Sequence, residues 1–186
     1  MLRPVPIPPG SYRFGPHNGQ LTVRTGRTGA VAKAGHDLLL EVTAWDATLT
    51  VGDETSLELN ADATSFEVRE GTGGMQALDD GDRANIEQTI DDEVLRGGAI
   101  EFRSTRVETS ADGAALRVEG DLDLLGTRRP VAFDLTAGDD GRLTGRARLR
   151  QTDFGLKPYS ALFGTLKVAD EVEVAVDARL PAAAGT

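Results

Sequence analysis

The sequence predicts an all-β protein, an eight-stranded antiparallel β-barrel with one inserted α-helix. Apolar residues stand at every second position along most of the chain, which is typical of strands with one buried face. One long extended segment changes its parity midway, as expected where a sheet bends to curl into a barrel. A single stretch has helical spacing.

Composition indicates one globular domain and excludes several classes of function. The 186 residues are 39% hydrophobic, which suffices for a substantial core. The net charge of −10, with no basic run to offset it, disfavours nucleic acid as a partner. The absence of cysteine excludes disulfides and thiolate chemistry. We expect a barrel domain over residues 12–180, between an extended Pro-rich arm (1–11) and a flexible tail (181–186).

The first residues do not resemble a secretory signal. Four prolines interrupt the apolar run that such a signal needs: Pro4, Pro6, Pro8 and Pro9. No later segment approaches the roughly 20 apolar residues of a membrane-spanning helix. We therefore expect a cytoplasmic protein with no integral membrane segment, and leave open whether it is a homodimer.

In the first half of the chain, alternation predicts several strands. Tyr12, Phe14, Leu21 and Val23 belong to a first strand that is broken at Gly15-Pro16. The segment 35–51 is too long for one ordinary strand, and its apolar residues switch parity between Val42 and Trp45, which predicts a bulge or bend. Further extended segments are expected at 57–61 and 65–68.

Residues 71–81 are rich in Gly and Asp and predict a loop that leads into the helix. Asp79, Asp80 or Asp82 can cap that helix. An apolar stripe with a spacing of four marks its buried face, and two glycines end it; the residues are Ile86, Ile90 and Val94, then Gly97-Gly98.

The clearest pattern in the second half is a hairpin over residues 118–136. Its first strand places Val118, Gly120, Leu122 and Leu124 on one face, and its second places Val131, Phe133 and Leu135 on one face. Gly126 allows the reversal, and Pro130 is expected to start the second strand. Other strands are expected around 100–104, 143–149 and 172–176.

The polar residues form no recognisable catalytic or metal-binding set. His36 and Asp37 are adjacent, but neighbouring strand residues face opposite ways, and no second histidine lies near enough to suggest a metal site. The glycines at 71–74 lack the ending of a phosphate-binding loop. A row of arginines on one strand face is best explained as a solvated outer face; it comprises Arg146, Arg148 and Arg150.

Aromatic residues are spread over most of the predicted elements and would meet inside a small barrel. They are Trp45, Phe66, Phe102, Phe133, Phe154, Tyr159 and Phe163. A barrel of this strand number can be filled by its own side chains or can hold a ligand. Periodicity alone leaves both arrangements open.

Three segments in order resemble one known family. They are GDRANIEQTIDDEVL leading into IEFRSTRVE, then VEGDLDLLGTRRPV, then QTDFGLKPYSALFGTLKVADEVEVAV. Together with GHDLLLEVTAW near the start, they resemble the YceI-like family of lipocalin-like polyisoprenoid-binding proteins over about residues 12–180. The stretch from Gly120 to Val131 is the most specific part of the resemblance.

The resemblance implies a lipocalin-like barrel whose pore takes a long amphipathic lipid, such as a polyisoprenoid, a quinone or a fatty acyl chain. It implies noncatalytic binding, carriage or storage, with no cofactor and no metal. We expect the pore wall to include Phe66, Phe102, Leu124, Phe133, Phe154 and Phe163. Trp45 and Tyr159 are expected near an opening, with His36 and Arg150 at the polar end.

Two other classes of function stay open. A lipid-modifying enzyme could use His36 with Asp37 or Asp153 as its acid–base group. A filled barrel could instead be a stress or structural module with a protein partner. The sequence specifies neither the ligand's chain length nor its head group.

Overall fold

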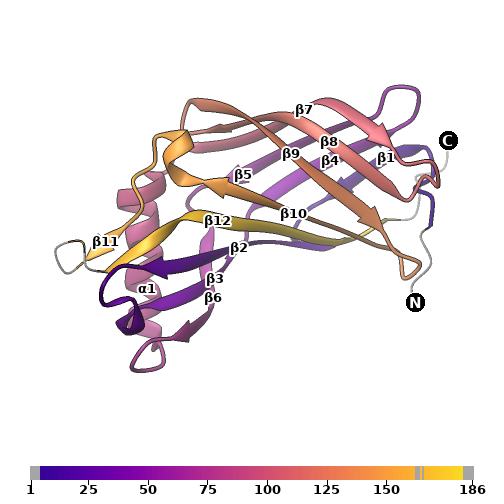
Figure 1. Ribbon diagram of the computed structural model, residues 1–186. Coiled ribbons are helices and arrows are strands. Elements are labelled where there is room, and N and C mark those ends of the chain that lie inside the picture. Colours follow the sequence, from indigo (N-terminus) through magenta and orange to yellow (C-terminus); the bar gives the residue numbers. More distant parts are fainter. Residues whose placement is uncertain (1–4, 162–163, 165, 182–186) are drawn as a thin grey trace.

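The computed structural model describes residues 5–161, 164 and 166–181. Among these residues it contains twelve strands, one α-helix and three short helical turns, arranged as in Figure 1. The strands are β1 (Gly10–Phe14), β2 (Gly19–Thr28), β3 (His36–Val42), β4 (Trp45–Val51), β5 (Ser56–Asp62), β6 (Phe66–Gly73), β7 (Ala99–Thr109), β8 (Ala115–Leu124), β9 (Thr127–Ala137), β10 (Arg142–Arg150), β11 (Ser160–Ala161) and β12 (Leu166–Arg179). The helical elements are η1 (Ala32–Ala34), α1 (Asp80–Thr89), η2 (Ile90–Leu95) and η3 (Gln151–Phe154).

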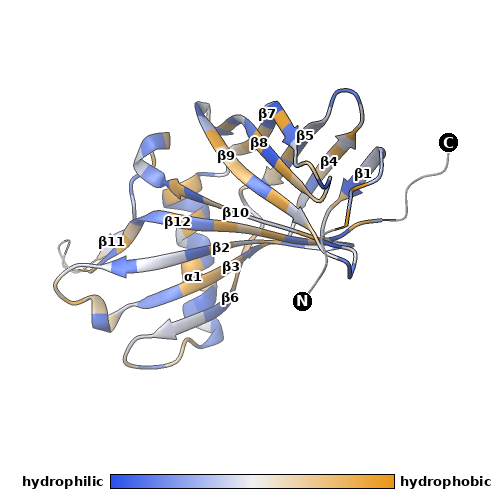
Figure 2. Cartoon of the chain, turned by 45° about the vertical axis from the view of Figure 1, so that its right-hand side comes forward, coloured by the Kyte–Doolittle hydropathy of each residue, from blue (hydrophilic) through white to orange (hydrophobic). Residues whose placement is uncertain are grey.

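All strands belong to one antiparallel sheet that curls strongly into a half-barrel (Figure 1). The order is β1-β4-β5-β7-β8-β9-β10-β12-β2-β3-β6, with β11 paired to β12. Apolar and polar residues alternate along the strands in Figure 2, as the sequence predicts. The prediction of eight strands is wrong, because the segments around 12–23 and 35–51 are each divided into two strands, residues 65–68 belong to a strand of their own, and β11 adds another.

The predicted bend within 35–51 is confirmed as the corner between β3 and β4. There the amide of Thr43 donates to the carbonyl of Ser65 at 2.9 Å, and the amide of Asp62 donates to the carbonyl of Ala44 at 2.9 Å. These bonds tie the corner to the equivalent corner between β5 and β6. The two bent segments thus turn together, and the sheet folds over without leaving these backbone groups unpaired.

The helix forms where the capping residues and the apolar stripe predict it. Asp79 is the N-cap, since its side chain accepts from the amide of Asp82 at 2.8 Å while the Asp82 carboxylate accepts from the Asp79 amide at 3.1 Å. The helix continues as the π-helical turn η2. It ends at Arg96 and Gly97, which adopt φ values of 52° and 63°.

Side chains of α1 bind the backbone of β6, which is an edge strand of the sheet. Glu87 Oε1 accepts from the amide of Val68 at 2.8 Å, and Arg83 Nη1 donates to the carbonyls of Val68 and Arg69 at 3.3 and 3.2 Å. Covering an edge in this way satisfies its unpaired polar groups and blocks pairing with another chain. It also holds the helix across this end of the half-barrel.

The predicted hairpin is confirmed, but its second strand begins earlier than predicted, and β6 elsewhere in the sheet ends later than predicted. Leu125 and Gly126 make the turn with φ values of 55° and 84°, but β9 already begins at Thr127. Pro130 therefore lies inside β9, opposite Asp121, at a level where β10 does not pair with β9 among the described residues. Likewise β6 runs on through Gly73, because β3 pairs with residues 71–73, so the predicted loop starts later.

The buried core is concentrated at the end of the half-barrel that lies away from α1. Its fully buried large side chains are Tyr12, Leu49, Leu116 and Val118. None of them borders the cavity described next. Among the described residues, no helix is long and apolar enough to cross a membrane.

Candidate functional site

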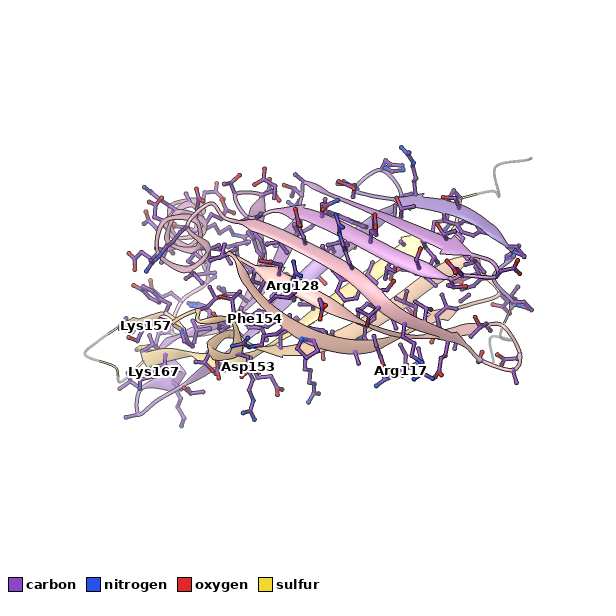
Figure 3. The ribbon with its side chains drawn as sticks, turned by 90° about the horizontal axis from the view of Figure 1, so that it is seen from above. Arg117, Arg128, Asp153, Phe154, Lys157 and Lys167 are labelled. Carbon is purple, nitrogen blue, oxygen red and sulfur yellow. The ribbon has the colours of Figure 1, made fainter. Side chains whose placement is uncertain are left out.

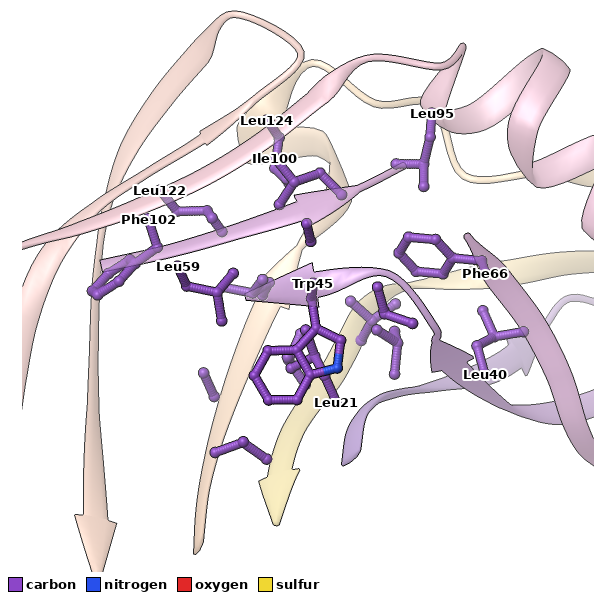
Figure 4. Close-up of a pocket in the computed structure, with 18 of the residues that line it drawn as sticks. Leu21, Leu40, Trp45, Leu59, Phe66, Leu95, Ile100, Phe102, Leu122 and Leu124 are labelled. Carbon is purple, nitrogen blue, oxygen red and sulfur yellow. The ribbon is translucent and has the colours of Figure 1, made fainter. Parts of the chain in front are cut away.

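A cavity of about 490 Å³ lies inside the half-barrel, between the inner face of the sheet and the helix. Its walls are the inward-facing residues of the strands, most of them aliphatic or aromatic; Figure 4 labels Leu21, Leu40, Leu59, Ile100 and Leu122 among them. The volume is within the range of about 300–1,000 Å³ that small-molecule sites occupy. Voids of this size are absent from ordinary packed interiors.

The helix closes one side of the cavity with its predicted apolar stripe. Ile86, Ile90 and Val94 all border the cavity, as does the buried Leu95 at the end of η2. Leu95 lies near Phe66 of β6 in Figure 4. The stripe thus faces a space rather than a packed core, and this distinction cannot be read from helical spacing.

Most of the residues expected in the pore come together around the cavity. Phe102 and Phe133 face each other from β7 and β9, with ring centroids 5.4 Å apart and planes tilted by 53°. The expected residues that border the cavity are Trp45, Phe66, Phe102, Leu124, Phe133, Arg150, Phe154 and Tyr159. Phe163 lies outside the described residues.

His36 does not border the cavity. Its Nε2 lies 2.7 Å from the carbonyl of Gln76, whereas the neighbouring Asp37 forms an ion pair with Arg27 at 3.6 Å. The prediction that His36 and Asp37 point in different directions is therefore confirmed. No histidine, aspartate or glutamate lines the cavity within the described part of the chain.

Arg150 stands at the border of the cavity, but its side chain is exposed. The predicted outer row is confirmed for its neighbours, since Arg146 pairs with Glu173 at 3.4 Å and Arg148 pairs with Glu171 at 3.6 Å. Arg146 and Arg148 thus direct their charged ends to acidic partners on β12, although Arg146, like Arg150, borders the cavity.

Besides Arg150 and Tyr159, other polar side chains border the cavity that were not identified from the sequence. Gln151 is buried and donates from Nε2 to the carbonyl of Ala169 at 3.1 Å. Asn85 and Thr89 border the cavity from the helix. Their positions depend on where α1 crosses the half-barrel, which no local pattern specifies.

Trp45 supplies the one buried side-chain polar atom that has no hydrogen-bond partner among the described residues. Only 7% of Trp45 is exposed, and its indole lies among the apolar lining residues in Figure 4. Burying an indole N–H without an acceptor is unfavourable, and such donors are usually paired. The indole ring borders the cavity, but its Nε1 has almost no accessible surface, so an acceptor would reach this donor only after a small shift of the ring.

Asp170 of β12 holds the turn η3, which carries Phe154 to the cavity. Its carboxylate accepts from Thr152 Oγ1 at 2.6 Å and from the Thr152 amide at 2.8 Å. The hydrogen bond from the Thr152 side chain, then that from its backbone, lower the pKa of Asp170 below its ordinary value of 3.8, and the charge of Arg150 adds to this effect.

We expect Asp170→Asn to lower the free energy of unfolding at neutral pH. The variant should also lose less of that free energy than the wild type when the pH is lowered. Because folding lowers the pKa of Asp170, its stabilising effect is present above 3.8 and disappears as the pH falls through the lowered value. Urea unfolding midpoints of both proteins over a pH series measure this difference. Identical acid dependence in the two proteins would show that the Asp170–Thr152 contact contributes nothing.

No groups of three or more potential metal ligands occur among the described residues.

The chain matches no curated protein sequence. It is similar in structure to Burkholderia cenocepacia BcnA, with a TM-score of 0.60 and 16% identity over 86% of this chain and 94% of that one. Two mutants of a protein named CJ YceI, one with a monobromobimane guest, each give a TM-score of 0.53 and 10% identity over 77% of this chain and 84% of theirs.

These structural similarities concern the fold, and the sequence match specifies the family. The YceI-like domain matches residues 22–180, which include all strands from β3 to β12, the helix and every cavity residue named above except Leu21. The chain therefore belongs to the YceI-like family.

Proposed function

We propose that this protein binds a long amphipathic lipid in its cavity and carries or stores it without chemical conversion. The YceI-like family is known for binding polyisoprenoids and other lipids, which supports a binding role in general. The observation that carries the proposal is the apolar cavity of about 490 Å³ covered by α1. A cytoplasmic location stays a prediction of the sequence.

The size of the cavity favours a ligand over the filled-barrel alternative. The apolar side chains around this space are not covered by other side chains of the protein, and ordinary packed interiors do not contain voids of this size. A hydrocarbon chain in the cavity instead gains about 25 cal/mol for each Å² removed from water.

The positions of the titratable residues disfavour the alternative of a lipid-modifying enzyme. His36, the base that such an enzyme would need, makes its contact with Gln76 outside the cavity. Asp153 is exposed at η3. A general acid or base must come within hydrogen-bond reach of the reacting group, and neither side chain borders the space where the lipid would lie.

The indole of Trp45 favours a cargo with an uncharged acceptor oxygen near this residue. A carbonyl or hydroxyl oxygen there would accept from Nε1 and satisfy the unpaired donor once the ring shifts enough to expose it to the cavity. A charged phosphate or carboxylate at the same depth would lose its hydration without meeting a free cation, because Arg146 is paired with Glu173 and the side chain of Arg150 is exposed to solvent. We therefore place an anionic head group, where the cargo has one, outside the apolar part of the cavity.

Mass spectrometry of an organic extract tests the proposal directly. The protein is purified without detergent, extracted, and compared with a mock purification. A prenyl lipid, quinone or fatty acyl species in stoichiometric amount is the expected result. Trp45 is the only tryptophan of the chain, so its fluorescence reports on added lipids. If the extract is empty and added lipids fail to quench this fluorescence, the carrier function is refuted.

We expect Trp45→Phe to weaken the binding of a prenyl quinone about tenfold, because one buried hydrogen bond is lost while the aromatic wall remains. A prenyl hydrocarbon of equal chain length should bind this variant and the wild type equally well. Equilibrium partitioning measured by mass spectrometry compares the two ligands. An equal loss for both would mean that the ring, and not its N–H group, determines affinity.

A further inference from the structure

One end of the half-barrel, beside α1, is formed by three segments that contact one another. They are residues 26–36, 71–78 and 154–169, of which 162, 163 and 165 are not described; we refer to the described residues of these segments as the rim. The backbone of Gly35 approaches Leu166 so closely that an added Cβ would lie 2.7 Å from Leu166 Cδ1, and Gly74 similarly contacts His36. Figure 1 shows this end opposite the two chain termini.

The charge of the rim is opposite to that of the whole protein. The chain has only three lysines, Lys33, Lys157 and Lys167, and all three lie in the rim. No aspartate or glutamate occurs in the three segments, although the chain has 30. Lys157 and Lys167 stand together at one end in Figure 3, whereas Arg117 lies toward the other end.

The rim lysines also differ from many of the arginines of the strands in their partners. All three are exposed, and none forms an ion pair among the described residues. By contrast, Arg117 and Arg142 on the strands pair with Asp134 and Asp177. The positive charge of the rim is therefore available to an external anion, whereas much of the strand charge is internally neutralised.

Exposed apolar side chains accompany these lysines. Of the four exposed large hydrophobic residues in the described chain, three lie in the rim: Val31, Met75 and Tyr159, with 38%, 87% and 42% of their surface exposed. Each comes from a different one of the three segments. Tyr159 also borders the cavity, so the rim adjoins the site of the proposed cargo.

We propose that the rim docks on the surface of an anionic lipid bilayer. Lysines are compact charges that bind lipid phosphates, and exposed apolar side chains on loops can enter the interface between headgroups and acyl chains. Three exposed apolar residues on separate segments, one of which borders the cavity, suit a fluid surface better than a groove-shaped protein partner. Docking in this orientation places the cavity against the bilayer, where a lipid can pass between the two.

The acidic character of the rest of the molecule does not prevent this docking. Acidic residues directly flank the three segments, among them Asp37, Asp79 and Asp170. These three carboxylates have partners, since Asp37 pairs with Arg27, Asp79 caps α1, and Asp170 accepts from Thr152. The three lysines are exposed and have no ion-pair partner among the described residues, so their charge is available to an anionic surface.

Flotation with lipid vesicles tests the proposal on the full chain. Wild-type protein is mixed with vesicles of phosphatidylcholine alone or of phosphatidylcholine with phosphatidylglycerol. The rim variant carries Lys33→Glu, Lys157→Glu and Lys167→Glu. The control variant carries Arg13→Glu, Arg103→Glu and Arg129→Glu, three exposed strand positions outside the rim, and has the same net charge.

We expect the wild type and the control variant to float with the anionic vesicles and to be released by high salt. The rim variant should bind roughly 100-fold more weakly, since each lysine near an anionic surface contributes about 1 kcal/mol. No flotation of the wild type, or an equal loss in both variants, overturns the proposal. Cargo extraction is measured separately, so failure of docking is distinguishable from failure of lipid binding.

Discussion

We expect Ala61→Phe to lower the affinity for a lipid cargo on the order of 100-fold while leaving the fold intact. Ala61 borders the cavity from β5, where it pairs with Trp45 on one side and Ile100 on the other. A phenyl ring there would displace on the order of 100 Å² of ligand contact, at about 25 cal/mol per Å². Because it enters open space, the ring avoids the strain that overpacking causes in a filled core.

The control for this experiment is the same substitution on the outer face of the sheet. Ala132 of β9 is exposed and does not border the cavity, so Ala132→Phe should retain wild-type affinity. Lipid retained after extraction and the thermal unfolding midpoint are measured for both variants. If Ala61→Phe keeps its lipid, the cavity is not the binding site; if it unfolds instead, the cavity is closed in solution.

We expect Gly120→Ala to destabilise the protein by about 3 kcal/mol, the upper part of the range for overpacked positions. Gly120 is buried in β8, opposite Ser104, where the pairing with β7 shifts its register. A Cβ at Gly120 would clash with the carbonyl oxygen of Arg103 and lie 2.5 Å from Phe102 Cζ. The backbone of β7 would have to move, and Phe102 would be pushed toward the cavity that it borders.

Gly52 provides a matched control, because no atom lies within 4 Å of the position that its Cβ would occupy. Gly52→Ala should change stability by less than about 1 kcal/mol, with any change toward higher stability. Urea unfolding gives both free energies. Equal small effects at the two glycines would mean that β7 and β8 separate readily, which contradicts the close approach of these strands in the structure.

Local patterns predicted most of the elements. Alternation specified the hairpin around Gly126, and a parity change specified the corner after Val42. The capping residues and the apolar stripe specified the helix. These features depend on neighbouring residues, because the period of side-chain orientation and the turn conformations are properties of short segments.

The strand boundaries that were predicted wrongly depend on pairing with residues distant in sequence. Gly73 lies in a strand because it pairs with His36, which overrides the weak strand propensity of the glycines before it. Pro130 is accommodated inside β9 because β10 pairs with that strand only beyond this level in the described chain. Neither pairing leaves a signal within the segment itself.

Some residues of the candidate site were predicted from local patterns, whereas others depend on the tertiary structure. Trp45, Phe102 and Phe133 were predicted to face the interior because aromatic residues at alternating positions belong to the buried face. That Trp45 has an unpaired donor, and that Gln151 and Asn85 border the same space, depends on where η3 and α1 cross the half-barrel. His36 faces away from the cavity, beside Gln76, for the same reason.

The sequence by itself determined the all-β class, the buried face of each long strand, the helix and the resemblance to the YceI-like family. Only the tertiary structure decided that the interior holds a cavity and that the three lysines lie together on the rim. Periodicity records which side of a segment avoids water, but not how far apart two such sides come to lie. That distance follows from the curvature of the sheet and the position of α1.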